Sequence, residues 1–448
     1  MTGRIAANFS GRTALALGLA ALLAGCGAIG GKHRPTTPTI GNRIPVLSHI
    51  SNDVTPDPTL ANVAVVLPPA QQNQDWSTAG GDPSKNVGHV ALGDAPQLAW
   101  TARIAGTTPK ARLAAAPVVG NGLLYVVDTN GTVNAFDTAT GAKRWAYQLD
   151  LAKRLRNSAF GGGATYNDGK VYATSGAGDV VALDAATGKQ IWRVKPAGPL
   201  RGSPTVAFNA VYAMTQDNQI MALDVADGHL LWQDVAASGE QGVFGVAAPA
   251  AAQGTVIAGY STGELVAYRY ENGRVLWSDA LARTSISTSV STLTDVDADP
   301  IIDSGRVYAL GQGGRMAAYE LVTGQRIWEL SLAGISTPAV SGEWIFTLTD
   351  DGRLLAIARS TGRIRWLTQL AHYKNSKKRN NPIFWTGPVL ANNKLWVANS
   401  LGQVYDVDVT SGQPTLFQNL KVAISLPPIV ANKTLYIMQN DGKIRAYR

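Results

Sequence analysis

The stretch "DTATGAKRW" at residues 137–145 returns almost unchanged as "DAATGKQIW" at residues 184–192. In each copy a turn glycine is followed four positions later by tryptophan. Such pairs recur as Gly141/Trp145, Gly188/Trp192, Gly228/Trp232, Gly273/Trp277, Gly324/Trp328 and Gly362/Trp366. A seventh copy has Gly412 but carries Leu416 in place of the tryptophan. Successive glycines are 38–51 residues apart, which is the period of a β-propeller blade.

Three further phrases precede each copy, so each repeat contains four short segments. One reads "GTVNAFD" (131–137) in the first repeat, and another reads "GLLYVVD" (122–128); each occurs in eight versions along the chain. In these phrases the type of side chain alternates from one residue to the next, which is the two-residue period of a β-strand. The innermost phrase usually opens with proline, which cannot donate to a neighbouring strand and therefore belongs at a sheet edge. The repeat thus predicts a blade of four antiparallel strands.

The two ends of the chain complete each other. The eighth repeat stops at "GKIRAYR" (442–448) without an outer strand, whereas "PQLAWTARI" (96–104) is an outer strand without a repeat. We therefore expect residues 98–103 to complete the last blade. The prediction is an all-β, eight-bladed propeller over residues 74–448, with seven blades as the nearest alternative. The repeated glycines and tryptophans then serve architecture and not catalysis, since a large aromatic ring wedges neighbouring blades together.

The first 73 residues differ in character from the repeats. Arg4 and Arg12 precede an apolar stretch that ends in "LAGC" (23–26), which resembles the lipobox of bacterial lipoproteins. We expect residues 1–25 to be a signal peptide and Cys26 to be the lipidated first residue of the mature chain. A plain signal peptide with a chance cysteine is the alternative. Residues 26–73 are rich in Pro, Thr, Asn and Ala and predict a flexible tether, in which an apolar strip could still bind a partner.

Composition excludes several classes of protein. The net charge of +8 is spread along the chain, and no nucleic-acid-binding motif is present. The densest basic run, "HYKNSKKRNN" (372–381), is either a solvated loop or a membrane or partner contact; its cations are Lys374, Lys377, Lys378 and Arg379. A single cysteine forms no internal disulfide. None of the five histidines (33, 49, 89, 229 and 372) sits in a metal or triad motif, so we predict neither a cofactor nor an enzyme.

The repeated phrases resemble those of pyrroloquinoline-quinone (PQQ) dehydrogenases across residues 96–448. This resemblance implies the propeller fold. Those enzymes usually have a longer chain, a vicinal Cys-Cys disulfide and a calcium site of Glu, Asn and Asp. This chain has only Cys26 and no haem-attachment motif. A periplasmic PQQ-dependent oxidoreductase is therefore the alternative function.

A better match is the BamB family, the non-catalytic lipoproteins of the outer-membrane β-barrel assembly (BAM) complex. The lipobox, the tether, "WSTAGGDPSKN" (76–86) and the bare eight-bladed ring carry this resemblance. It implies a scaffold anchored to the outer membrane and facing the periplasm. The implied partners are a POTRA domain of BamA, other BAM subunits and nascent outer-membrane proteins. The scaffold could orient BamA or offer strand edges to nascent strands, and a partner-binding propeller outside the BAM complex is a third possibility.

The resemblance also implies which residues contact BamA. Leu200, Arg201 and Gly202 match a Leu-Arg-Gly motif of the family, and Asp295, Val296 and Asp297 match an Asp-Val-Asp motif on the same face. We expect Leu200 to be an exposed anchor and Arg201 to bind an oxygen acceptor. Gly198 and Pro199 depart from the residues usual before the first motif. Two alternatives stay open for the second motif: the aspartates fix a turn, or they bind Ca²⁺ together with Asp299.

Overall fold

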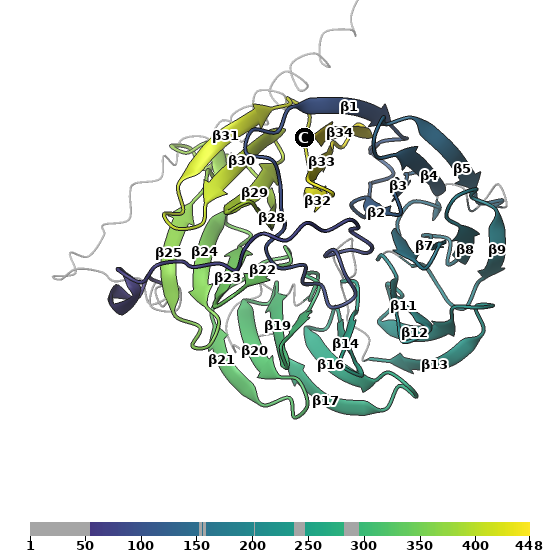
Figure 1. Ribbon diagram of the computed structural model, residues 1–448. Helices are drawn as coiled ribbons and strands as arrows, with labels where there is room; N and C mark the ends of the chain where they lie inside the picture. Colours follow the sequence, from purple (N-terminus) through teal and green to yellow (C-terminus); the bar gives the residue numbers. More distant parts are fainter. Residues whose placement is uncertain (1–53, 152–154, 156–157, 201, 237–246, 282–294) are drawn as a thin grey trace, which may run out of the picture. The chain divides into compact units, whose positions relative to one another are not determined.

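The computed structural model describes residues 54–448 apart from 152–154, 156–157, 201, 237–246 and 282–294. Within this range, eight four-stranded antiparallel sheets are arranged as the blades of a ring (Figure 1). The sequence-based prediction of an all-β, eight-bladed propeller is confirmed. No helix in these described ranges is both long and apolar enough to cross a membrane. Cys26 lies outside the described residues.

The strands follow one another from the hub to the rim of each blade. Blades 1 and 2 contain β2 (Val118–Gly120), β3 (Leu123–Val127), β4 (Thr132–Asp137), β5 (Lys143–Gln148), β6 (Ala164–Asn167), β7 (Lys170–Thr174), β8 (Val180–Asp184) and β9 (Gln190–Val194). Blades 3 and 4 contain β10 (Thr205–Ala207), β11 (Ala210–Met214), β12 (Gln219–Asp224), β13 (Leu230–Val235), β14 (Ala250–Ala252), β15 (Thr255–Gly259), β16 (Glu264–Arg269) and β17 (Val275–Ala280).

The second half of the ring repeats this order. Blades 5 and 6 contain β18 (Ile301–Asp303), β19 (Arg306–Gly311), β20 (Arg315–Glu320), β21 (Arg326–Leu330), β22 (Ala339–Ser341), β23 (Trp344–Leu348), β24 (Arg353–Ala358) and β25 (Ile364–Gln369). Blades 7 and 8 contain β28 (Trp385–Ala391), β29 (Lys394–Asn399), β30 (Gln403–Asp408), β31 (Pro414–Asn419), β32 (Ile429–Ala431), β33 (Thr434–Met438), β34 (Lys443–Tyr447) and β1 (Leu98–Arg103). A hairpin of β26 (Tyr373–Asn375) and β27 (Asn380–Pro382) lies between blades 6 and 7, and a 3₁₀ turn, η1 (Pro58–Leu60), precedes β1.

The last blade combines both ends of the propeller. β1 pairs antiparallel with β34, with Thr101 opposite Arg445. The backbone N–H of Arg448 donates to the carbonyl of Gln97 at 2.8 Å, one residue beyond the last paired residues of these two strands. The ring is therefore held shut by a strand ladder and not by a covalent connection.

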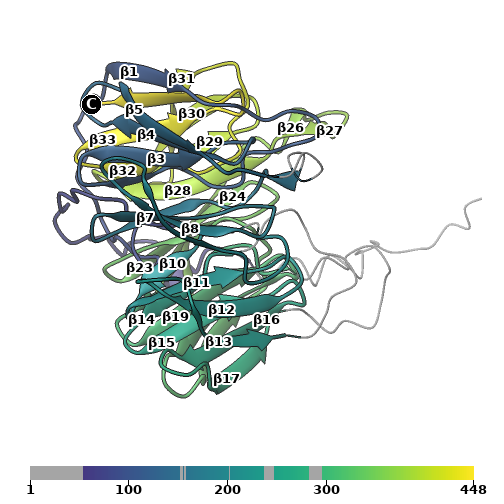
Figure 2. The same cartoon turned by 90° about the vertical axis from the view of Figure 1, so that its right-hand side faces the viewer.

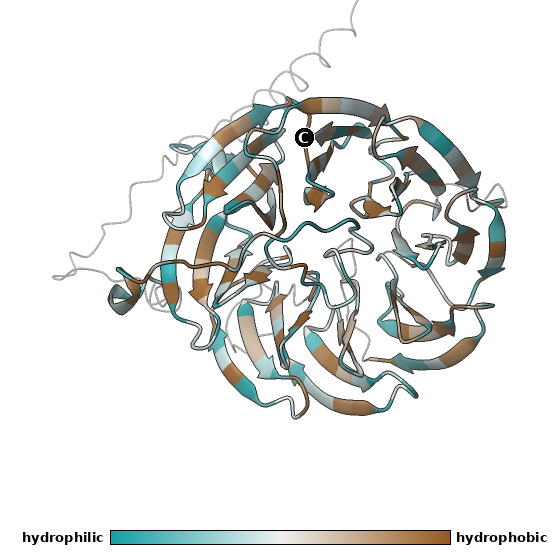
Figure 3. Cartoon of the chain, viewed as in Figure 1, coloured by the Kyte–Doolittle hydropathy of each residue, from teal (hydrophilic) through white to brown (hydrophobic). Residues whose placement is uncertain are grey.

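The burial pattern explains why these short strands form blades. The two middle strands of a blade are buried on both faces; β12, for example, has four consecutive buried residues. Its outer neighbour β13 alternates, and only Trp232 on that strand is fully buried. Figure 3 shows the same change, with apolar residues continuous toward the hub and interrupted at the rim. Each blade thus buries both of its faces against neighbouring blades.

Tryptophans of the outer strands join seven of the eight junctions. Each indole N–H donates to a backbone carbonyl of the next blade at 2.8–3.1 Å. Each ring also covers the turn glycine of that blade, where an added Cβ would come within 2.5–2.8 Å of a tryptophan atom. The ring–glycine pairs are Trp100/Gly141, Trp145/Gly188, Trp192/Gly228, Trp232/Gly273, Trp277/Gly324, Trp328/Gly362 and Trp366/Gly412.

The eighth junction, between blades 7 and 8, is built differently. Blade 8 has no turn between its two outer strands, because β34 and β1 come from distant parts of the chain, so no turn glycine is available for a tryptophan to cover. Leu416 occupies the tryptophan position and is 49% exposed. Phe417, its neighbour, instead packs edge-on against Trp396 and Tyr447, with ring centroids 5.0 and 5.3 Å away.

Residues 71–92, which we call the plug, cross the hub of the ring (Figure 1). The plug makes hydrogen bonds to seven of the blades: with Asn432, Val119, Tyr166, Thr205, Ala251, Ile302 and Asn392. Residues of the plug thus complete the inner edges of strands whose backbone groups would otherwise face the hub.

Residues 54–70 contact blade 6, which the plug does not bond. The N–H of Asp57 donates to the carbonyl of Ile364 at 2.8 Å, and Arg365 Nε donates to the carbonyl of Val63 at 2.7 Å. Val65 is buried in a cluster that includes Trp344. This part of the predicted tether therefore lies against the propeller. The predicted boundaries at residues 25 and 73 stay predictions.

The two sides of the ring differ. The plug meets the turns at the ends of the inner strands, such as Asn392 and Asn432. Where the structure describes them, the connections from the rim of one blade to the hub of the next lie on the other side, together with the β26–β27 hairpin (Figure 2). We call this second side the loop face. Both predicted partner-binding motifs belong to such connections, between blades 2 and 3 and between blades 4 and 5.

Candidate functional site

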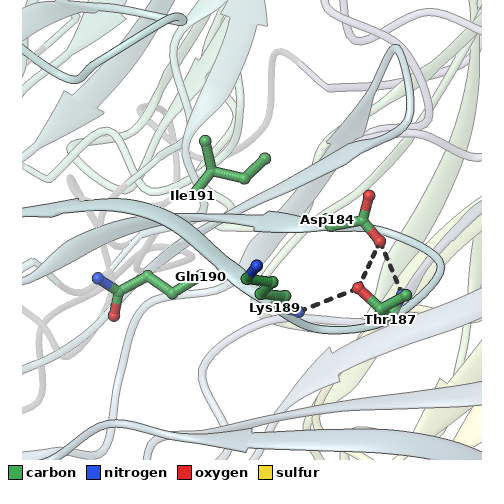
Figure 4. A pocket seen from close by; sticks show the side chains of 5 residues that line it. All are labelled: Asp184, Thr187, Lys189, Gln190 and Ile191. Carbon is green, nitrogen blue, oxygen red and sulfur yellow. Dashed lines mark hydrogen bonds between the residues drawn. The ribbon is translucent and has the colours of Figure 1, made fainter.

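The repeated Asp-x-x-Thr-Gly turn is occupied by its own hydrogen bonds (Figure 4). The Asp184 carboxylate accepts from the N–H and the hydroxyl of Thr187 at 2.8 and 2.6 Å. The N–H of Lys189 donates to the same hydroxyl at 3.3 Å. Hydrogen bonds to Thr187 lower the pKa of Asp184. Because the polar groups of the turn satisfy one another, the repeated phrase is architectural, as the recurrence of this turn in blades 1–7 suggests.

A channel lies at the hub of the ring, between the plug and the connections of the loop face. Its volume is about 950 Å³. The plug lines one end with Trp76 and Lys85, and connections of the loop face line the other, including Gly202, Asp297 and Phe384. Polar residues in its wall include Asp299, Gln312 and Asp350. Cavities of this size accommodate a drug-sized molecule or side chains of a partner.

Lys85 fixes the plug at the closed end of the channel. Its side chain is only 2% exposed, and its Nζ donates to Thr205 Oγ1 at 2.9 Å and to the Ala79 carbonyl at 3.0 Å. Burial lowers the pKa of Lys85 to about 8, and the charges of Asp299 and Asp82 partly offset this effect. Sequence reasoning missed this buried lysine, because nothing local marks the segment as part of the core.

Leu200, the first residue of the Leu-Arg-Gly motif, is 0% exposed. The expectation of an exposed leucine is wrong. A backbone bridge to Thr215 directs this part of the chain along blade 3, and Leu200 packs in a cluster with Tyr172 and Val206. Its N–H donates to the Ser175 carbonyl at 3.3 Å. Leu200 therefore supports the loop from beneath.

The other two residues of this motif have different positions. Arg201 lies outside the described residues. Gly202 lines the channel, and its carbonyl accepts from Thr174 Oγ1 at 2.8 Å. The roles of all three in partner binding stay predictions.

The Asp-Val-Asp motif is also largely buried. Asp295 and Val296 are each 2% exposed. The carbonyl of Asp295 accepts from the N–H of Gln312 at 2.8 Å, and the N–H of Val296 donates to Tyr260 at 3.2 Å. Val296 lies so near Gly259 that a Cβ there would come within 2.5 Å of it. Val296 therefore wedges the loop between blades 4 and 5 and leaves Asp297 at the channel.

The surroundings of Asp297 disfavour the ionised form of its carboxyl group. Burial, together with the neighbouring carboxylates of Asp295 and Asp350, raises the pKa of Asp297 to about 7. Asp350 also lies in the channel wall; its side chain is exposed to solvent there, and desolvation by the surrounding wall raises its pKa to about 6. Asp297 Oδ2 and Gln312 Oε1 have no hydrogen-bond partner among the described residues. Carboxyl groups with raised pKa values in a cleft are typical of functional sites.

The structure thus brings together parts of both predicted motifs. Gly202 and Asp297, 95 residues apart in sequence, line the same channel on the loop face. Asp350 and Gln312 join them, and the sequence did not single out either residue. Each lies next to a turn between strands, where Asp and Gln are common, so no local signal distinguishes them.

The hypothesis of a calcium site at Asp295, Asp297 and Asp299 is not supported. The Asp299 carboxylate accepts from the N–H of Ala248 at 2.7 Å, and its charge acts on Lys85. In the described ranges, only one group of three carboxylates or histidines has its ligand atoms all within 4.8 Å: Asp224, Asp227 and His229. This group lies on an outer turn of blade 3, and His229 Nδ1 and Asp227 Oδ1 already pair at 2.6 Å.

Comparison with known proteins identifies the family. A family model described as outer membrane protein assembly factor BamB matches residues 96–158 and 150–368. BamB of Salmonella typhimurium strain LT2 is 32% identical over 335 residues, which cover 74% of this chain and 83% of that protein. The chain belongs to the BamB family. BamB of Escherichia coli strain K12 is 29% identical over 354 residues, covering 78% of this chain and 88% of that protein.

Solved structures agree on the fold. The crystal structure of BamB from Moraxella catarrhalis superimposes with a TM-score of 0.67 at 20% identity and covers 79% of this chain and 99% of that chain. Quinohemoprotein alcohol dehydrogenase from Comamonas testosteroni reaches 0.65 at 15% identity, covering 84% and 81%. Fold similarity alone does not separate a BamB from a dehydrogenase, because both classes share the ring. Sequence similarity places this chain with BamB.

Proposed function

We propose that this chain is a non-catalytic scaffold lipoprotein of the BAM complex. In this role it binds the periplasmic POTRA region of BamA and assists the folding and insertion of outer-membrane proteins. The observation that carries the proposal is the similarity to BamB proteins along most of the chain.

The loop face is the proposed contact surface. Asp297 carries a carboxylate whose ionisation is disfavoured by burial and by nearby negative charge. A basic side chain from BamA would restore the balance of charge there, since a close cation favours the ionised form of a carboxyl group. Leu200 and Val296 then hold the two loops in position and do not themselves touch the partner, because both are buried.

Arg201 provides the direct test. Arg201→Glu should abolish or strongly reduce co-purification of BamA with the full chain, because the reversed charge repels the acceptor group that an arginine binds. Arg274→Glu, at an exposed turn of blade 4, is a matched control and should leave recovery unchanged. Equal recovery of BamA with both variants would remove Arg201 from the proposed interface.

The anchor is part of the same proposal. We expect residues 1–25 to be removed and Cys26 to carry the acyl chains that hold the protein on the periplasmic side of the outer membrane. Cys26→Ala should move the protein from the membrane fraction to the soluble fraction and abolish labelling with radioactive palmitate. Retention in the membrane fraction without label would show that partners, and not lipid, hold the chain there.

A PQQ-dependent oxidoreductase remains the second candidate, because the quinohemoprotein dehydrogenase shares this ring and the ring here has an open channel. Reconstitution with PQQ and Ca²⁺, followed by dye reduction with alcohols or sugars, distinguishes the two. We expect no reduction above background. Turnover with either substrate class would replace the scaffold proposal.

A further inference from the structure

The β26–β27 hairpin adds a distinct element to the loop face (Figure 2). Tyr373 pairs with Pro382 and Asn375 with Asn380, so the chain between them forms a closed turn. The hairpin carries four exposed cations: Lys374, Lys377, Lys378 and Arg379. This is the densest basic run of the sequence.

The charge around the hairpin is strongly one-sided. Residues 352–405 contain nine Lys and Arg and no Asp or Glu. Four of the cations outside the hairpin have carboxylate partners: Arg353 with Asp351, Arg359 with Asp303, Arg363 with Asp57, and Lys394 with Asp406. In the part of the chain that the structure describes, no ion pair involves a hairpin cation. The propeller thus pairs four of its five other cations here with carboxylates, and among the described residues it leaves the hairpin cations without such a partner.

The hairpin is firmly attached at its base. Ile383 is 3% exposed, and its N–H donates to the His372 carbonyl at 2.8 Å. Trp385 Nε1 donates to the Ala371 carbonyl at 2.8 Å. Within the turn, the N–H of Lys378 donates to Asn375 Oδ1 at 3.0 Å. The cations are therefore presented on a pre-formed support, which lowers the entropy lost when a partner binds.

The hairpin belongs to the same rim as the predicted partner contacts. Phe384 directly follows it and is 66% exposed. Phe384 and Trp385 line the channel together with Gly202 and Asp297. A protein that covers the channel mouth through Gly202 and Asp297 therefore reaches Phe384 and the hairpin. The rim thus combines an apolar side chain and a positive group with the carboxyl groups of Asp297 and Asp350.

We infer that the hairpin is a second contact for the protein that binds the loop face, and that it recognises an acidic strip on that protein while Phe384 packs beside it. This inference rests on the proposed function. A protein surface can match both signs of charge on the rim. An anionic lipid or nucleic-acid surface matches only the hairpin, because it offers no cation to the channel carboxylates. Complementary charge mainly accelerates association and weakens with salt.

The test compares two triple variants of the full chain for association with the purified periplasmic region of BamA. Lys377→Gln, Lys378→Gln and Arg379→Gln together remove three hairpin charges. Lys143→Gln, Lys189→Gln and Arg274→Gln remove three exposed charges near the outer-strand turns and serve as the control. At low salt the hairpin variant should associate about tenfold more slowly than the parent, with dissociation nearly unchanged. The control should match the parent, and the difference should shrink as salt rises.

Phe384→Ala separates packing from charge. It should accelerate dissociation and leave the salt dependence of association intact, because it removes contact area and no charge. Equal unfolding midpoints of parent and variants are expected, since every altered side chain is exposed.

The results that would overturn the inference can be told apart from those that would also overturn the proposed function. If the parent binds BamA and the hairpin variant associates equally fast at every salt concentration, the inference is overturned and the proposed function stands. If the parent does not bind BamA, both fail. Vesicles containing phosphatidylglycerol provide the third arm: loss of vesicle binding by the hairpin variant, with unchanged association to BamA, assigns the hairpin to a lipid surface and overturns the inference.

Discussion

Asp297 shows how single residues of this propeller are held in unfavourable states by neighbours that are distant in sequence. Its pKa is raised to about 7 because the loop buries it and because Asp295 and Asp350 lie nearby. Val296 makes this placement unavoidable, since it is wedged against Gly259 and fixes the loop. A residue that destabilises its own fold in this way is a candidate for a function that needs it.

Replacement of this carboxyl group should stabilise the protein in a pH-dependent manner. The folded-state pKa of Asp297 lies above the unfolded value of 3.8, so the ionised form is the disfavoured one. The cost is absent below about pH 4, grows as the pH rises toward 7, and is complete above it. Asp297→Asn should therefore raise the free energy of unfolding by on the order of 2 kcal/mol at pH 8 and leave it unchanged at pH 4.

Urea unfolding of both proteins at the two pH values checks this. Asp217→Asn, at an exposed position, controls for the change in net charge. A stability gain of equal size at pH 4 and pH 8 would mean that ionisation of Asp297 is not its origin. The same variant should bind BamA less well, because it lacks the charge that the proposed interface uses.

At the scale of the elements, the blades are joined by a repeated fit between a ring and a glycine. Seven tryptophans cover seven turn glycines, and every one of these glycines has a positive φ. Two independent constraints therefore act at one position: a left-handed backbone and the absence of space for a Cβ. The junction without a turn glycine is also the one with Leu416, which shows that the two residues form one unit.

Two glycines of blade 2 separate these constraints. Gly169 and Gly188 both have φ of 73°, but a Cβ on Gly169 would meet nothing within 4 Å, whereas one on Gly188 would lie 2.6 Å from Trp145. Gly169→Ala should cost about 1 kcal/mol from backbone strain alone. Gly188→Ala should cost about 2–4 kcal/mol, because overpacking adds to it. Urea midpoints measure both, and equal costs would show that the close approach to Trp145 is unimportant.

Each tryptophan should contribute more to the stability of the protein than Leu416, which takes the tryptophan position in the seventh repeat. Trp232 is 7% exposed, donates to the Tyr270 carbonyl at 2.8 Å, and lies 5.8 Å from the rings of Tyr212 and Tyr268. Trp232→Ala should lower the free energy of unfolding by about 3–5 kcal/mol. Leu416→Ala, at a half-exposed site, should lower it by less than about 1 kcal/mol. Comparable losses in thermal or urea unfolding would contradict the different construction of the eighth junction.

At the scale of the whole molecule, the plug and the closing strand β1 bind parts of the ring that are far apart in sequence. The plug makes hydrogen bonds to seven blades, and residues 54–70 contact the remaining one. Lys85 is the buried charge at the centre of this arrangement, compensated by Asp82 and Asp299. Loss of the plug would open the channel at both ends.

Lys85→Met should loosen the plug while leaving the blades intact. The substitution preserves most of the volume but leaves Asp299 near the channel without its cation, and breaking a buried charge interaction of this kind costs about 3 kcal/mol. Hydrogen exchange should accelerate in residues 71–92 and stay slow in the middle strands. Lys110→Met, at an exposed position, should change neither. Uniformly faster exchange in all blades would show that the plug and the ring unfold together.

The sequence by itself determined the ring. Strand period, turn glycines and rim tryptophans are local signals that repeat, so eight copies predict eight blades, and the unmatched "PQLAWTARI" and "GKIRAYR" predict a shared last blade. Even the exception at Leu416 follows, once the last blade has no turn for a tryptophan to cover.

Only the tertiary structure decided what faces the channel. Leu200 and Asp295 lie in connections without any period, so their burial depends on which neighbouring blade the loop follows. Asp297 and Asp350 are 53 residues apart, and their charges interact only because neighbouring blades pack side by side at the hub. Lys85 becomes a core residue because the segment that carries it crosses the hub. The burial of residues in the repeated strands follows from the local sequence pattern. The charge at the channel depends instead on contacts between blades, which form only when the chain folds into the ring.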